Sequence, residues 1–181
     1  MGCATARTLE RVAAALGELH GAPIQFDRVC DVAGGGVLLA LPALLQNGLL
    51  THSRELFSMP EGFYPLESIF LLLAFMALER VPSLEALRYE APGEWGKILG
   101  LDRIPEVRTL RAKLRELCAQ PGQAAAWNSA LARQWMEEQP EHAAGVYYID
   151  GLVRVYHGAL TKLPRRYITR ERLCLRGTTD Y

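Results

Sequence analysis

Hydrophobic residues recur with a helical period along most of the chain, and this pattern predicts a largely helical protein up to about residue 140. Helices are predicted over these segments: 7–20, 34–50, 64–81, 83–90, 93–101, 105–118 and 123–139. The most apolar run, 69–78, is too short to span a bilayer, which takes about 20 apolar residues. It is predicted to be a buried core helix, and no membrane partner is expected.

Several helix boundaries carry their own signals. Ser83 is predicted to be an N-cap, and Gly100 is predicted to close the helix that precedes it. Pro42 marks either a first helical turn or a kink, and Gly48 is predicted to lie at a C-cap. In the first helix one apolar face is predicted, formed by Leu9, Val12, Ala13 and Leu16.

At Pro140 the period changes to short runs rich in Val, Ile and Tyr, which predict strands. The candidate strands are 146–150, 152–158, 166–168 and 172–177. The fold class is therefore predicted as α+β, with a helical region at 1–140 and the first antiparallel strands of a sheet at 141–181. Such strands have open edges and no covering helix, so we expect the sequence to be the front part of a longer protein or a truncated copy.

Charge is balanced overall but unevenly placed. The chain has 20 basic and 20 acidic residues, yet residues 151–181 hold seven Arg and Lys and only two acids. This asymmetry indicates an anionic partner for the C-terminal part. The four cysteines form no CxxC pair, and no signal peptide is visible, so a reducing cytoplasm fits best.

Residues 84–117 read as helix, turn, short helix, turn and longer helix, which is a helix-turn-helix-like arrangement. Basic residues cluster at its end: Arg103, Arg108, Arg111, Lys113 and Arg115. The forked guanidinium group suits phosphate oxygens and guanine edges, so these residues are candidates for DNA binding. The same spacing fits a solvated helix of a bundle. The turn at Gly100 and the helix start at Pro105 favour DNA binding, so this interpretation becomes about as strong as that of a solvated bundle helix.

Other catalytic motifs are missing, which leaves one acid to consider. The glycine run 33–37 lacks the ending of a phosphate-binding loop, and the histidines show no metal-ligand spacing. Asp150 and Gly151 lie between two strand candidates, where Asp-Gly is a strong hairpin signal. A single acid cannot hold a pair of divalent ions. From the residues alone, the hairpin interpretation of Asp150 is the stronger one.

Three segments resemble a known family. "GVYYIDGLVRVYHG" (145–158) and "LPRRYITRERLCLRGTTDY" (163–181) resemble the opening of the catalytic domain of bacterial DDE-type transposases, whose core is RNase H-like. "GKILGLDRIPEVRTLRAKL" (96–114) resembles the helical DNA-binding region before that core. The resemblance implies that Asp150 is the first catalytic acid and a Mg²⁺ ligand. The bound ions would activate a water or a 3′-hydroxyl for attack on a phosphodiester.

The resemblance also implies the partners and the limits of this chain. The expected partner is double-stranded DNA at transposon ends, encountered at the nucleoid, and a homo-oligomer is compatible with the sequence. The other catalytic acids would lie beyond Tyr181, so the chain alone is expected to be inactive. Two alternatives stay open: a non-enzymatic helical DNA-binding regulator, and a helical interaction protein whose basic tail is a solubilising surface. Salt-sensitive DNA binding would separate these two.

Overall fold

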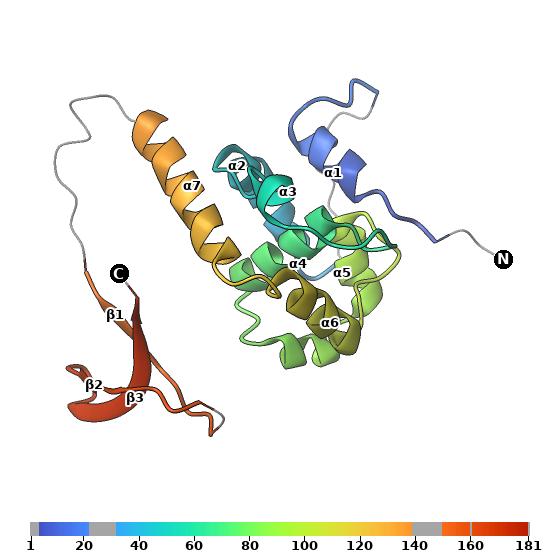
Figure 1. Ribbon diagram of the computed structural model, residues 1–181. Helices are drawn as coiled ribbons and strands as arrows, with labels where there is room; N and C mark the ends of the chain where they lie inside the picture. The colour runs from blue at the N-terminus through green and yellow to red at the C-terminus, as the bar shows by residue number, and fades with distance from the viewer. Residues whose placement is uncertain (1–3, 22–31, 139–149, 160, 181) are drawn as a thin grey trace. The chain divides into compact units, whose positions relative to one another are not determined.

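The computed structural model describes residues 4–21, 32–138, 150–159 and 161–180 (Figure 1). The chain divides into two compact units, Met1–Trp135 and Met136–Tyr181. The first is helical and the second carries a small antiparallel sheet. The predicted α+β class is therefore confirmed.

The helical segments appear largely where the hydrophobic period predicts them. In chain order the elements are α1 (Thr8–Ala15), the 3₁₀-helix η1 (Gly35–Ala40), α2 (Leu41–Gln46), α3 (Ser53–Leu56), α4 (Leu66–Leu78), the 3₁₀-helix η2 (Leu84–Tyr89), α5 (Pro92–Leu99), α6 (Val107–Leu117) and α7 (Gln123–Glu138). The prediction over 34–50 is divided between η1 and α2, and the one over 83–90 is a 3₁₀-helix rather than an α-helix.

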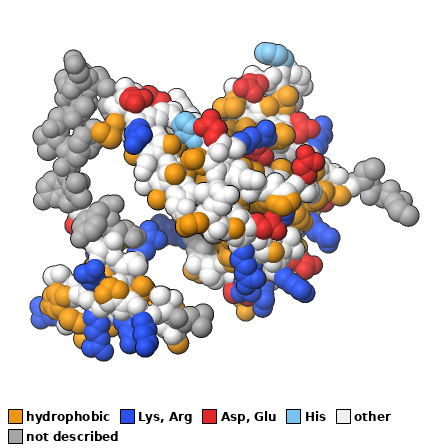
Figure 2. Space-filling view, in the orientation of Figure 1, with side chains coloured by type: hydrophobic (Ala, Val, Ile, Leu, Met, Phe, Trp, Pro, Cys, Tyr) orange, Lys and Arg blue, Asp and Glu red, His pale blue; other side chains and the backbone are white. Residues whose placement is uncertain are grey.

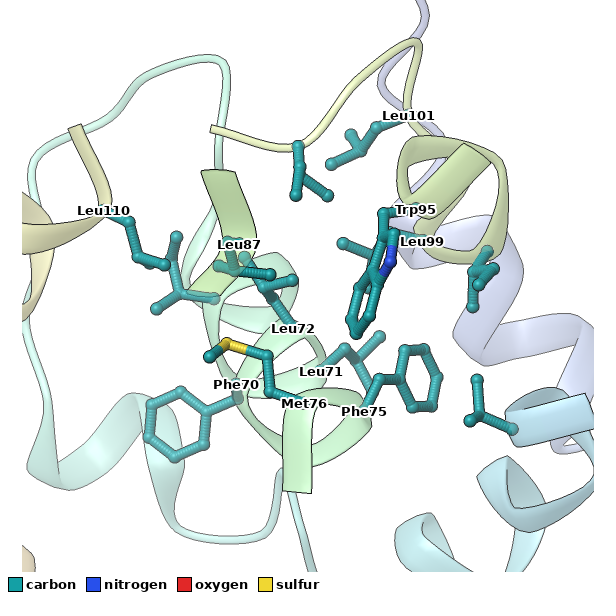
Figure 3. Packing of buried hydrophobic residues seen from close by; sticks show 14 of the residues in the cluster. Phe70, Leu71, Leu72, Phe75, Met76, Leu87, Trp95, Leu99, Leu101 and Leu110 are labelled. Carbon is teal, nitrogen blue, oxygen red and sulfur yellow. The ribbon is translucent and has the colours of Figure 1, made fainter. Parts of the chain in front are cut away.

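Helix α4 lies at the centre of the hydrophobic core. Ile69, Leu71, Leu72 and Phe75 are 0% exposed. Figure 3 shows Trp95 from α5 and Leu87 from η2 pointing toward the α4 side chains. A helix that is apolar on every side is stable only when it is buried on every side. The prediction of a core helix is thus confirmed, and none of the helices in the described ranges is long and apolar enough to cross a membrane.

Phe75→Ala should lower the free energy of unfolding of the helical unit by about 3–5 kcal/mol, because it removes a fully buried ring and leaves a cavity. Urea unfolding followed by circular dichroism measures the change. Leu78→Ala is the matched control, since Leu78 ends the same helix but is 45% exposed. An equal loss in both variants would contradict the central place of Phe75 in the core.

The predicted boundary signals act as expected. Ser83 Oγ accepts a hydrogen bond from Ala86 N at 3.3 Å and caps η2. Gly100 follows α5 with a φ of 73°, a left-handed conformation that glycine adopts without strain. Pro42 lies in the first turn of α2, and Gly48 follows that helix with a φ of 91°. These boundaries are local, so their residues predict them directly.

The packed face of α1 differs from the predicted one. Leu9 and Leu16 are 50% and 49% exposed, whereas Thr8 is 2% exposed and donates a hydrogen bond from Oγ1 to Leu99 O at 2.9 Å. The helix is held against the end of α5, where Arg7 N donates to Gly100 O at 2.7 Å. These contacts with a distant segment rotate α1, so Val12 packs on the core and the two leucines do not.

The second unit contains β1 (Leu152–Val155), β2 (Arg165–Ile168) and β3 (Leu173–Asp180). The strands are antiparallel in the order β1-β3-β2, so β3 is central. The strands predicted over 152–158, 166–168 and 172–177 are confirmed, while most of the candidate at 146–150 lies outside the described residues.

The predicted hairpin turn at Asp150-Gly151 lacks the expected conformation, because a two-residue Asp-Gly turn needs positive φ at both residues and neither residue has it. The strand predicted before this turn, 146–149, lies outside the described residues. In the described sheet β1 pairs with β3, with Val155 opposite Gly177. The hairpin of the sheet joins β2 to β3, and its turn includes Arg172 with a φ of 53°. The long-range pairing with β3, rather than the local turn signal, decides the place of β1.

Candidate nucleic-acid interface

Helix α6 is strongly amphipathic and presents arginines to solvent. Arg108, Arg111 and Arg115 are exposed, as predicted, and their spacing of three and four residues places them along one side of the helix. Val107, Leu110 and Leu117 are buried and anchor the helix to the core. Figure 2 shows Lys and Arg side chains gathered over α6.

Two of the five predicted cations are already paired with acids. Arg111 forms an ion pair with Glu85 of η2, and the second oxygen of that carboxylate lies 3.0 Å from Arg88 Nη2. Lys113 Nζ lies 3.6 Å from Glu116 Oε2, and its side chain is only 17% exposed. An anion that approaches these groups must compete with a carboxylate, so they are weaker candidates for binding phosphate.

The other three predicted cations are differently placed. Arg103, Arg108 and Arg115 are exposed, and no ion pair is formed by them with any residue in the described part of the chain. We call these three residues the α6 cation surface. Because no ion pair within the described ranges engages them, these guanidinium groups can approach an anionic ligand without first leaving a carboxylate.

An open groove brings part of this surface together with a residue that the sequence did not indicate. The groove has a volume of about 380 Å³, and its lining includes Arg88, Arg103 and Arg108. Two acids also line it, of which Glu90 accepts a hydrogen bond from Trp95 Nε1 at 3.1 Å. Arg88 reaches the groove because η2 packs against α6, a contact that has no signature in the hydrophobic period.

Arg103 is positioned by a close backbone approach to α5. A Cβ atom on Gly96 would lie 2.6 Å from the Arg103 Cα and N atoms, so only glycine leaves room at this point. Next to it, Ile104 N donates to Pro92 O at 3.0 Å, and Asp102 Oδ2 accepts from Thr5 N at 2.6 Å. The backbone that carries Arg103 is therefore held on both sides, which fixes the point on the surface from which its side chain extends.

A further arginine has a structural role. Arg11 of α1 is partly buried and donates from Nη2 to Lys97 O at 2.8 Å. Burial lowers the pKa of its guanidinium group, because desolvation disfavours the charged form. An arginine remains protonated at neutral pH even so. Arg11 joins α1 to α5 and is not a candidate for the interface.

The helix-turn-helix interpretation stays a prediction. The three elements of the predicted segment are present as η2, α5 and α6, in the predicted order. The first of them is a short 3₁₀-helix, and α6 is the longest of the three. The structure thus places the arginine-bearing helix last, with its apolar side against the core and its basic side exposed.

Asp150 lies just before Gly151 and strand β1, and it is exposed. The register pairs Leu152 with Asp180, so the backbones of the two acids come to the same end of the β1–β3 pair. Within the described ranges, no group of three or more His, Cys, Asp or Glu residues could hold a metal ion. The described residues therefore do not complete a Mg²⁺ site, and no catalytic step through a metal is derived from them.

The fold and this surface place the protein in a broad class: α+β chains in which a helical unit presents exposed arginines and a second unit forms a small, arginine-rich sheet. The whole chain, residues 1–181, matches the model of a family described as transposase protein, and the chain belongs to this family. No curated protein and no solved structure matches it. Membership of a transposase family implies interaction with DNA.

Proposed function

We propose that this chain acts in DNA transposition and that its helical unit binds duplex DNA through the α6 cation surface. The observation that carries the proposal is the set of three exposed arginines without ion-pair partners in the described part of a transposase-family chain. Guanidinium groups bind phosphate oxygens through two parallel hydrogen bonds, and helix α6 holds two of them on a rigid scaffold.

The ion pairs decide how much each of the five cations is expected to contribute to the affinity for DNA. An unpaired arginine gains the full effect of counterion release when it meets a phosphate. Arg111 must first give up part of its interaction with Glu85, so its net contribution is smaller. Lys113 loses part of its reach as well, because its side chain is mostly buried.

The finer part of the proposal concerns catalysis. We place the chain in the DDE type, with Asp150 as the first acid of an RNase H-like core and as a ligand of Mg²⁺. Its support is the resemblance of residues 145–158 and 163–181 to that family, together with an exposed carboxylate two residues before strand β1. A DNA-binding regulator would share the first part of the proposal, but membership of the transposase family favours transposition.

Glu85→Gln tests the proposal by a gain of binding. The substitution removes the carboxylate that holds Arg88 and Arg111, so both guanidinium groups become available to DNA. We expect tighter duplex binding, and a plot of log K against log salt that is steeper by up to about two units. Fluorescence anisotropy of a labelled duplex at several salt concentrations measures both quantities.

Glu10→Gln is the matched control for this variant. Glu10 also pairs with an arginine, Arg7, but it lies on α1, outside the groove. Both substitutions change the net charge equally. If Glu10→Gln strengthened binding as much as Glu85→Gln, the effect would come from net charge, and the α6 cation surface would not be the duplex contact.

A further inference from the structure

The small sheet has two chemically different faces. Successive side chains of a strand point to opposite faces, and residues paired across antiparallel strands share a face. By this register one face carries eight positions, and seven of them have exposed side chains: Leu152, Arg154, Arg165, Tyr167, Cys174, Arg176 and Thr178. The eighth position is that of Asp180, which the register pairs with Leu152 at the end of the β1–β3 pair. The other face carries half-buried apolar residues, among them Val153, Ile168 and Leu175. We call the first one the arginine face.

Two arginines of this face lie directly opposite each other. The register pairs Arg165 of β2 with Arg176 of β3, and both are exposed. Neither forms an ion pair with any residue that the structure describes. Like charges directly opposite each other destabilise an antiparallel pair. Phosphates bound at the two guanidinium groups would reduce this repulsion, so the pair favours binding of a ligand with neighbouring anionic groups.

An exposed aromatic ring completes the face. Tyr167 is 59% exposed and follows Arg165 by two residues, so both side chains point to the same side of the sheet. Proteins bind single-stranded nucleic acid with two features: cations placed along the phosphate backbone and an aromatic ring on which a base can stack. In a duplex the base faces are already stacked on one another, which leaves the ring without a partner.

We infer that the arginine face binds single-stranded DNA, with Arg165 and Arg176 at consecutive backbone phosphates and a base stacked on Tyr167. Figure 2 shows Lys and Arg side chains over the sheet unit. The inference rests on the proposed function for the choice of DNA as the nucleic acid. It concerns a surface of the second unit, whereas the α6 cation surface belongs to the first.

Binding of a labelled oligo-dT strand to the full 181-residue chain tests this inference. Tyr167→Ala should weaken binding roughly 5- to 100-fold, the effect of losing one stacked base, while Tyr167→Phe should retain it. Arg165→Thr and Arg176→Thr should each flatten the plot of log K against log salt by about 0.7 units. Neither variant should lower the midpoint of thermal unfolding, since each removes a like-charge pair.

Arg166→Thr is the matched control. Arg166 is exposed, lies on the same strand and carries the same charge, but the register places it opposite Leu175, on the other face. It should leave the affinity for oligo-dT nearly unchanged. An equal effect of Arg166→Thr, an unchanged affinity of Tyr167→Ala, or failure of the unmodified chain to bind oligo-dT would each overturn the inference.

A second measurement separates this inference from the proposed function. Alanine variants of the α6 cation surface should lose duplex binding but keep oligo-dT binding, and the Tyr167→Ala variant should show the reverse. If the α6 variants bind duplex normally, the proposed duplex contact fails while the arginine face stands. If oligo-dT binding is lost in the α6 variants instead, the single strand binds to the helical unit and the inference fails.

Discussion

Replacement of Arg103, Arg108 and Arg115 together by alanine is expected to reduce duplex affinity by roughly two to three orders of magnitude at about 0.1 M salt. Each lost phosphate contact removes about 0.9 units from the dependence of log K on log salt, and at this salt concentration each unit corresponds to about tenfold in affinity. The three arginines are exposed and unpaired within the described ranges, so their loss should leave the fold intact. Anisotropy titrations over a range of salt concentrations measure both effects.

The double variant Arg111→Ala and Lys113→Ala is the control for this expectation. It removes two charges from the same helix, but both groups are paired with glutamates. Its salt dependence should fall by clearly less than one unit for each charge removed. The contrary result is that the double variant and the triple variant lose the same salt dependence for each charge removed. In that case net charge, rather than the α6 cation surface, would govern DNA binding.

Asp150→Asn is expected to abolish Mg²⁺-dependent DNA cleavage and strand transfer in a transposition assay driven by the native gene. Asparagine has nearly the shape of aspartate but lacks its charge, and a hard divalent cation depends on anionic oxygen ligands. Asp150 is exposed and lies outside the strands, so folding and duplex binding should not change. Transposition frequency and circular dichroism of the purified variant measure the two expectations.

Glu171→Gln provides the comparison for this variant. Glu171 is an exposed acid of the same unit, in the turn between β2 and β3, and its loss changes the charge equally. Transposition should survive in it. Normal transposition in Asp150→Asn would leave Asp150 without a catalytic role, because the interpretation of this residue as a metal ligand requires its charge.

Local signals were sufficient for much of the helical unit. The apolar run 69–78 has no polar side to offer solvent, so it could only become the buried centre of the core, as α4 does. Ser83 and Gly100 act at helix ends through their own hydrogen bond and backbone conformation. The period change at Pro140 likewise predicts strands in the second unit, because alternation reflects the geometry of the strand itself.

Three features that matter for function depended on contacts between distant segments. The Glu85 carboxylate reaches Arg111 only because η2 packs on α6, and this contact divides the predicted cations into paired and unpaired groups. The order β1-β3-β2 brings Arg165 opposite Arg176 and pairs β1 with the distant strand β3. Helix α1 is held beside Gly100 in a rotation that leaves Leu9 and Leu16 half exposed instead of packed on the core. Periodicity reports which positions of an element are apolar, but the partner that an element meets, and the rotation at which it meets that partner, are decided by tertiary packing.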